Sequence, residues 1–276
     1  MPDVDPSRAA PLPAPTVVPF PAPLPDLVER ARAYRLAGND SAPAAPAATV
    51  LMVRDSVKGT GLEVLMLRRV LAMAFAGGMH VFPGGVVDGA DYGSDADIAA
   101  ASLKAAAREA FEETGVLLGS PTAGAVRPSS DVLEADRRAV LAREATFDNV
   151  LTRHGFVPAA DQLRPWAHWI TPEFEPRRYD TRFFIALMPT AQSARDVGGE
   201  SDRVEWVRPD DALAAGDRGE LLLMPPTEVT LREIAMFDTA ADAFAAAEHR
   251  VLRPLLVTVD LDADPPRFVL TDSSVT

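Results

Sequence analysis

The sequence predicts an α/β domain in which strands and helices follow one another along most of the chain. Two β-rich runs, Ala48 to Arg54 and Leu62 to Arg69, flank a turn over Lys58 to Gly61. A glycine loop then leads into a run of good helix formers that starts at Ala99 and that Gly115 is placed to end. Two strands, a glycine loop and an acidic helix therefore form the front of the domain.

The rest of the chain predicts more helices and strands. Ser129 to Arg153 is a helical stretch, with charged positions interspersed among apolar ones. The aromatic and β-branched content of Thr181 to Met188 is typical of a buried strand. We further expect a strand at Glu200 to Val207, helices at Pro225 to Phe237 and Ala240 to Arg250, and a closing strand pair at Leu255 to Asp260 and Arg267 to Thr271.

The first 47 residues differ from the rest in composition. Residues 1–25 are rich in Pro and Ala with little periodicity, which predicts disorder. A short helix is expected near residues 26–37, followed by a second linker. We therefore assign residues 1–47 to a disordered or linker segment and residues 48–276 to the domain.

Composition limits the classes of function. No apolar run approaches the ~18 residues of a membrane span, and no secretion signal is evident. The absence of cysteine excludes disulfides, thiolate metal sites and a cysteine nucleophile, so we expect a cytoplasmic protein. A net charge of −13 argues against nucleic acid as a partner. A small-molecule substrate is expected, and the sequence leaves a homodimer open.

Three carboxylates gather in the last turns of the predicted helix. Glu109, Glu112 and Glu113 project from one side, opposite an apolar side that includes Phe111. Neighbouring carboxylates repel one another by roughly 0.2–0.5 kcal/mol per pair. A divalent cation such as Mg²⁺ or Mn²⁺ removes that repulsion. The alternative is a solvated acidic helix face.

The surrounding residues favour the cation. The segment R-E-A-F-E-E-T-G-V, which begins at Arg108, resembles the second half of the Nudix box, and Phe82-Pro83-Gly84-Gly85 resembles the F-P-G-G that opens it. This resemblance implies a Nudix α/β/α sandwich with a mixed central sheet, here with a helical insertion near residues 129–153 and C-terminal helices. It also implies an enzyme, a diphosphatase that hydrolyses phosphorus-containing acid anhydrides.

The box departs from the family pattern in its length. Gly85 and Arg108 are separated by nine residues more than is usual, and Ala100 stands where the first box glutamate would fall. The acidic residues of the inserted loop are the candidates to replace that glutamate: Asp88, Asp91, Asp95 and Asp97.

Further features narrow the resemblance. They are the lengthened box, the segment H-V-F-P-G-G-V-V-D, and the later segments W-I-T-P and R-R-Y-D-T-R-F-F. Together they are similar to the group that contains the mammalian peroxisomal coenzyme A diphosphatase. That group cleaves coenzyme A and acyl-coenzyme A to 3′,5′-ADP and (acyl-)4′-phosphopantetheine. A separate coenzyme A signature is matched at Arg69 and Gly78 but has Ala74 at its second arginine position. Alternatives are hydrolysis of ADP-ribose, NADH or another nucleoside diphosphate derivative, and a non-catalytic nucleotide sensor.

The resemblance also implies roles for single residues. Mg²⁺ or Mn²⁺ would be held by Glu109, Glu112, Glu113 and a backbone carbonyl of Gly84 or Gly85, with Glu200 as a further ligand and Glu205 as its rival. The catalytic residues would be Glu109, Glu113 and Arg108. Glu109 would accept a proton, and Arg108 would orient Glu112. Candidates for substrate contact are Arg69, Arg178 and Arg182. Pocket walls are expected from Trp166, Trp169 and Phe174, and structural roles from His80 and His168.

Overall fold

The computed structural model describes most of the chain beyond the first 22 residues. The described residues are 23, 25–38, 40–57, 59, 61–70, 77–93, 96–158, 160–195 and 201–272. The expected disorder of residues 1–22, and the candidates Ala74, Asp95 and Glu200, lie outside these ranges.

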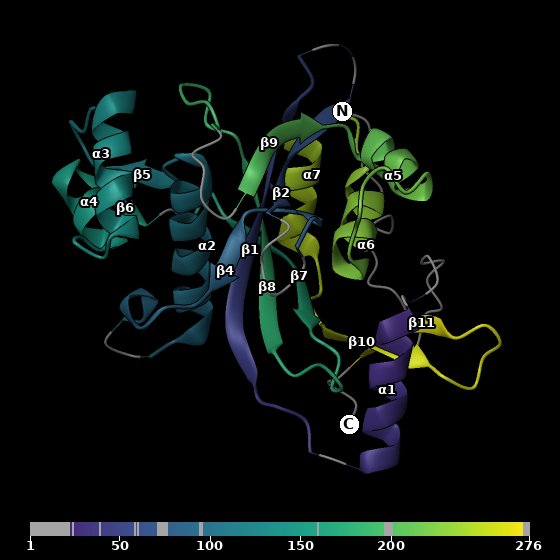
Figure 1. Cartoon of the computed structure of the whole chain (residues 1–276). Coiled ribbons are helices and arrows are strands. Elements are labelled where there is room, and N and C mark those ends of the chain that lie inside the picture. Colours follow the sequence, from purple (N-terminus) through teal and green to yellow (C-terminus); the bar gives the residue numbers. More distant parts are fainter. Residues whose placement is uncertain are drawn as a thin grey trace.

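A mixed sheet of nine strands forms the centre of the molecule (Figure 1). The main path of the sheet runs in the order β11-β10-β7-β8-β1-β2-β3, while β4 pairs with β1 and β9 pairs with β2. The pairs β1–β8 and β7–β10 are parallel and the other pairs antiparallel. The strands are β1 (Ala44–Asp55), β2 (Leu62–Arg69), β3 (His80–Val81), β4 (Gly84–Val86), β7 (Arg164–Ile170), β8 (Arg178–Leu187), β9 (Ser201–Val207), β10 (Pro254–Asp260) and β11 (Arg267–Asp272).

Helix α2 (Ile98–Thr114) covers one face of the sheet. It begins where the Asp97 side chain accepts a hydrogen bond from the Ala99 N–H (2.9 Å) and ends at Gly115, whose φ of 73° favours glycine. Its alanine-rich side is buried against β1, and Phe111 packs on Phe147 beyond it, with ring centroids 5.8 Å apart. The predicted separation of an apolar and an acidic side is therefore confirmed.

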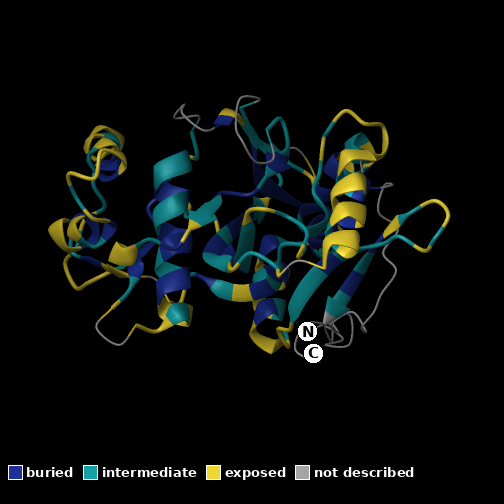
Figure 2. Ribbon diagram, turned by 60° about the horizontal axis from the view of Figure 1, so that its bottom comes forward, coloured by how far each residue is buried: buried dark blue, intermediate teal, exposed yellow. Residues whose placement is uncertain are grey.

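The opposite face is covered by α6 (Pro225–Ile234) and α7 (Ala240–Ala246), with α5 (Pro209–Asp217) beside α6 (Figure 1). Alternate residues of β1 explain the two layers. Val50 and Met52 join the core under α2, whereas Leu51 and Val53 join the core under α6 and α7. Figure 2 shows buried segments running through the middle of the molecule, with exposed residues on the outer helices and loops. The predicted α/β sandwich is confirmed.

The helical insertion lies on the far side of α2 from the sheet (Figure 1). The single stretch expected over residues 129–153 is two helices, α3 (Ser130–Leu141) and α4 (Phe147–Arg153). Arg143, with φ of 57°, lies in the break, and Thr146 starts α4 with a capping box. A small sheet of β5 (Gly119–Pro121) and β6 (Phe156–Pro158) flanks them.

The expected linker is shorter in the structure. Helix α1 (Pro25–Ala37) forms near its expected place, and its Val28 and Ala31 are buried. Strand β1 already begins at Ala44, because the residues from Ala44 onward pair in parallel with β8 from Arg178 onward. Strand β7 and helix α5 were not predicted. No helix among the described residues is long and apolar enough to cross a membrane.

Candidate active site

The two glycines after Phe82-Pro83 lie where backbone and side chains leave no room for a larger residue. Strand β4 pairs Gly84 with Thr49 and Gly85 with Ala48 of β1. A Cβ on Gly84 would lie 2.5 Å from the Ala48 carbonyl oxygen, and one on Gly85 would lie 2.4 Å from Glu109 Oε1. Glycine at position 84 is therefore required for the close approach of this loop to the central strand, and glycine at position 85 leaves room for the Glu109 carboxylate.

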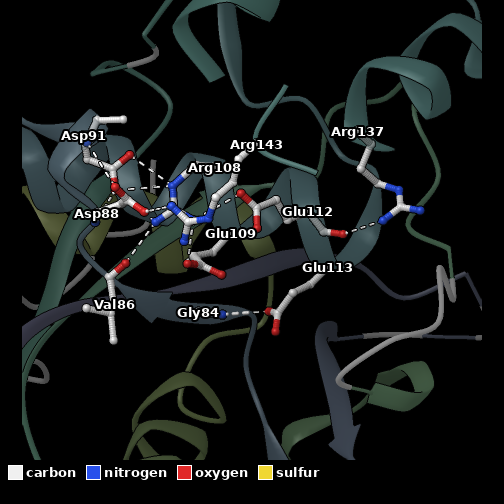
Figure 3. A network of polar contacts seen from close by, with 11 residues as sticks. Gly84, Val86, Asp88, Asp91, Arg108, Glu109, Glu112, Glu113, Arg137 and Arg143 are labelled. Carbon is white, nitrogen blue, oxygen red and sulfur yellow. Dashed lines mark hydrogen bonds and ion pairs between the residues drawn. The ribbon is translucent and has the colours of Figure 1, made fainter. Parts of the chain in front are cut away.

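Arg108 is the centre of the polar network on α2 (Figure 3). Its Nη1 donates to Glu109 Oε1 (2.7 Å) and to Glu112 Oε1 (3.2 Å), which confirms the predicted ion pair with Glu112. Its Nη2 donates to the Val86 carbonyl (2.9 Å), and thus fastens α2 to β4. These contacts fix the orientation of two of the three box carboxylates.

Asp91 supplies a further partner for Arg108. Arg108 Nη2 donates to Asp91 Oδ2 (2.9 Å) and Nε to Oδ1 (3.1 Å), while the Asp91 side chain is only 1% exposed. Asp91 belongs to a 3₁₀ turn, Gly89–Asp91, in the inserted loop, and it also accepts from the Asp88 N–H (2.8 Å). Of the described candidates for the missing first glutamate, Asp91 is the one that contacts the box arginine.

Glu109 has a perturbed acidity. Its burial raises the pKa to about 7, although the guanidinium of Arg108 acts in the opposite direction. The side chain is 14% exposed and lines a cavity. A carboxyl group with a pKa near neutrality can accept a proton at the pH of a cell.

The last turn of α2 is held from two sides. The Glu113 carboxylate accepts a hydrogen bond from the Gly84 N–H (2.9 Å), and the Glu112 carbonyl accepts one from Arg137 Nη1 of α3 (3.0 Å) (Figure 3). Arg137 is buried and also donates to Glu134 (2.8 Å). The insertion therefore positions the acidic end of α2, and satisfies a carbonyl that a helix terminus would otherwise leave without a partner.

A cavity of about 850 Å³ opens at this network. At one end it is lined by Arg108, Glu109, Glu112 and the two glycines. Toward β7, β10 and β11 the lining includes the apolar side chains of Leu27, Trp169, Ile170, Phe183, Val257 and Phe268, together with the polar side chains of Thr171, Glu175 and Arg177, and this part is called the apolar end. The cavity is thus lined both by α2, on one face of the sheet, and by residues that belong to the core on the other face, such as Trp169, Phe183 and Val257.

The donor set fits a hard divalent cation. Carboxylate oxygens and glycine carbonyls are the ligands that Mg²⁺ and Mn²⁺ prefer. As the side chains lie, no three acidic or histidine residues in the described part of the chain converge on one point. Arg108 lies between Glu109 and Glu112, while Glu113 is turned to Gly84. The residue types therefore suit a divalent cation. In this structure Glu109 and Glu112 are paired with Arg108 instead.

The comparison with protein families decides the assignment. The model of the NUDT19 Nudix domain matches residues 96–234, about half of the chain. The chain belongs to the Nudix hydrolase family.

Individual Nudix relatives agree with this assignment. A Caenorhabditis elegans protein named nudix hydrolase 7 is 32% identical over 179 residues, which cover 64% of this chain and 57% of the relative. A Gallus gallus protein named acyl-coenzyme A diphosphatase NUDT19 is 28% identical, over 69% of this chain and 65% of the relative. The chain thus spans less than two thirds of the length of these two relatives. A crystal structure of a Nudix hydrolase from Alicyclobacillus acidocaldarius superposes with a TM-score of 0.64 at 27% identity, covering 74% of this chain and 96% of that one.

The arginines predicted to contact substrate do not come together at the Nudix cavity. Arg69 lines it, but Arg178 and Arg182 do not. Arg178 donates to the backbone carbonyls of Thr171 (3.1 Å) and Ala42 (2.7 Å), and Arg182 lies 3.8 Å from Asp180. Side chains alternate along β8, so the cavity is lined by Tyr179, Thr181 and Phe183, and the even-numbered residues face away.

Two cavity arginines were missed, Arg177 and Arg143. Arg177 precedes β8 by one residue and has the same parity as the cavity-lining positions, a signal that the sequence did contain. Arg143 donates to Asp88 (2.8 Å) from the break between α3 and α4, and no local pattern marks it.

The remaining aromatic and histidine candidates separate into cavity and core. Trp169 lines the cavity, whereas Phe174 does not, and Trp166 is fully buried with its indole N–H donating to Glu233 (2.9 Å). His168 is hydrogen-bonded to Asp180, a contact that holds the pKa of that carboxyl below its ordinary value. His80 is buried in the sheet, and its burial lowers its pKa. Neither histidine lines the cavity. Glu205 lies on β9, 3.0 Å from Arg203, also outside the cavity lining.

Proposed function

We propose that the protein is a metal-dependent hydrolase that cleaves the diphosphate of coenzyme A or acyl-coenzyme A to 3′,5′-ADP and (acyl-)4′-phosphopantetheine. The name of the chicken relative supports this substrate, as do the sequence features downstream of the box. The elongated box, with its paired Asp91 and Arg108, supports diphosphate chemistry at the end of α2.

The lining of the cavity is the main support for this proposal. One continuous space joins the box carboxylates to a wall of apolar side chains. A substrate that fits both must carry a polyanionic diphosphate and a long, largely apolar arm. Acyl-coenzyme A has this division, with pantetheine and the acyl chain on one side of the diphosphate, whereas ADP-ribose and NADH are polar along their whole length.

The residues of the box have separate tasks in the proposed reaction. Glu109, Glu112, Glu113 and a carbonyl of Gly84 or Gly85 would hold Mg²⁺ or Mn²⁺. When bound, the cation would polarise phosphoryl oxygens and would lower the pKa of the attacking water. Glu109, which lines the cavity beside Glu112, is the proposed acceptor of the proton of that water. Arg108 orients Glu112 through their ion pair, and Asp91 keeps Arg108 in place.

The cationic residues along the cavity compensate for the acidic character of the chain. Arg69, Arg143 and Arg177 line the cavity of a protein with net charge −13. They are the cavity-lining groups suited to meet the adenosine phosphates, because a charge-assisted hydrogen bond is about twice as strong as a neutral one.

A substrate panel tests the proposal. The purified protein is incubated with Mg²⁺ or Mn²⁺ and with coenzyme A, octanoyl-coenzyme A, ADP-ribose or NADH, and the products are separated by chromatography. We expect 3′,5′-ADP from both coenzyme A compounds, and no reaction with EDTA. Faster cleavage of ADP-ribose or NADH would overturn the substrate assignment, and binding without turnover of any compound would indicate a sensor.

A further inference from the structure

The apolar end of the cavity includes Trp169, whose indole N–H is a buried hydrogen-bond donor. Trp169 is 3% exposed and lines the cavity, and its Nε1 is buried with no hydrogen-bond partner among the described residues. Trp166, three residues earlier on the same strand, donates its indole N–H to Glu233. A buried donor without a partner costs roughly the desolvation of that group, so it points to an acceptor that a ligand supplies.

The walls around Trp169 combine apolar side chains with the polar side chains of Thr171, Glu175 and Thr181, and they come from distant parts of the chain. Leu27 of α1, Val257 of β10 and Phe268 of β11 line this end together with Ile170 and Phe183. Such a space takes an apolar chain that carries a few carbonyl groups. It is continuous with the space next to Glu109 and Glu112, so one molecule can occupy both ends.

Helix α1 closes this end through contacts at its polar side. Arg30 pairs with Glu175 (3.0 Å), which also lines the cavity, and Arg35 pairs with Asp262 in the loop between β10 and β11 (3.0 Å). Val28 and Ala31 are buried in the same helix. These contacts keep Leu27 at the cavity, whereas Leu36 of α1 is 88% exposed.

We infer that the apolar end, formed around Trp169 and Leu27, is the subsite for the acyl-pantetheine arm of the substrate, with Trp169 donating to a carbonyl of that arm and Leu27 limiting the length of the acyl chain. This inference rests on the proposed coenzyme A substrate. It assigns the protein to acyl-coenzyme A in preference to free coenzyme A, because only the ester fills the apolar walls.

Chain length is the first test. Wild-type kcat/KM is measured for coenzyme A and for its acetyl, octanoyl and palmitoyl esters, and each buried methylene is expected to raise it roughly fourfold until the cavity is full. Leu27→Trp reduces the space and should lower the ratio of octanoyl-coenzyme A to coenzyme A at least tenfold. Leu27→Ala enlarges it and should shift the preference to longer chains.

Leu36→Trp and Leu36→Ala are the matched controls, since they make the same changes on the exposed part of the same helix. We expect both to keep the wild-type ratio, and circular dichroism to show that all four variants are folded. Equal kcat/KM for all chain lengths, with a ratio that Leu27→Trp leaves unchanged, would overturn the inference while the proposed chemistry stands.

Binding without turnover is the second test. Octanoyl-coenzyme A is titrated in EDTA while tryptophan fluorescence is recorded, with Trp169→Phe to identify the signal among the three tryptophans. We expect saturable quenching that the variant lacks, and a three- to tenfold weaker affinity of the variant, measured by calorimetry, as the loss of one hydrogen bond predicts. If no coenzyme A compound is hydrolysed but this response occurs, the subsite stands and the proposed reaction falls. No response sinks the subsite.

Discussion

The two ends of the cavity are built in different ways. The carboxylate end comes from one helix and one loop, and its residues are fixed by charge-assisted hydrogen bonds to Arg108 and to backbone groups. The apolar end comes from α1, β7, β8, β10 and β11, which lie far apart in the sequence and meet only in the folded chain. The first end performs chemistry that tolerates little displacement, whereas the second binds a chain by shape, and shape changes with each lining side chain.

The largest expected effect lies at the carboxylate end. Glu113→Gln removes one ligand charge and keeps the side-chain shape, so the fold should persist while kcat falls on the order of 100-fold or more. The matched control is Glu144→Gln, an exposed position outside the cavity, which should leave kcat unchanged. Near wild-type turnover of the Glu113 variant would show that the box carboxylates are not the catalytic centre.

The second-largest effect is expected for the buried ion pair between Asp91 of the inserted loop and Arg108. Asp91→Asn keeps the size of the side chain but removes the most buried of the three carboxylates that pair with Arg108, and we expect a loss of about 1.5–3 kcal/mol in the free energy of unfolding. Urea denaturation measures this loss, and kcat should fall as well because Arg108 also orients Glu112. Asp97→Asn is the control, because asparagine caps a helix as well as aspartate does. Equal stability of both variants would contradict the role of Asp91.

The cavity arginines should set the preference for the 3′-phosphate of the substrate. A charge-assisted hydrogen bond contributes on the order of 1.5–3 kcal/mol, or at least tenfold in kcat/KM. We expect acyl-coenzyme A to be cleaved faster than its 3′-dephospho form, and Arg177→Ala or Arg69→Ala to reduce that difference. Arg178→Ala should not reduce it, because Arg178 bonds to Thr171 and Ala42 away from the cavity. An effect of Arg178 alone would reverse this assignment.

The smallest expected effect concerns the insertion that supports α2. The guanidinium of Arg137 holds the pKa of Glu134 at about 2, below its ordinary 4.5, so the ionised form stabilises the folded chain. This contribution is complete above pH 4.5 and is lost as the pH falls toward 2. For a pair with a partly exposed carboxylate we expect Glu134→Gln to cost about 1 kcal/mol at pH 7. Urea unfolding at pH 7 and pH 3 checks this: an equal cost at both values would contradict the ion pair.

The carboxylate end of the cavity was more predictable from the sequence than the apolar end. Helix α2 was predicted to its last residue because the run of helix-forming residues and Gly115 are local signals. Strand β2 was likewise predicted with its bounds, Leu62–Arg69. The pairing of Asp91 with Arg108 could only be narrowed to four aspartates, since the path of an inserted loop depends on contacts that spacing does not contain.

The apolar end was not predictable in this way. Nothing in the sequence of α1 indicates that Leu27 lines the same cavity as Trp169, because this depends on the order of the strands and on ion pairs between α1 and distant loops. The choice of Arg178 over Arg177 is different. It was a mistake in strand parity, which the phase of Thr181 and Phe183 could have corrected.

Strand β1 has a consequence for how the molecule opens. It is paired with β2 and β4 on one side and with β8 on the other, and its residues Val50 to Val53 are completely buried. Its amide hydrogens should exchange with solvent only through global unfolding, whereas α1, tied down by surface ion pairs, should open at far lower cost. In that partly opened form the glycines of β4 remain paired with β1 and the carboxylates remain on α2, while the Trp169 end is uncovered. A long substrate could then enter from the α1 side without disturbing the residues that cleave it.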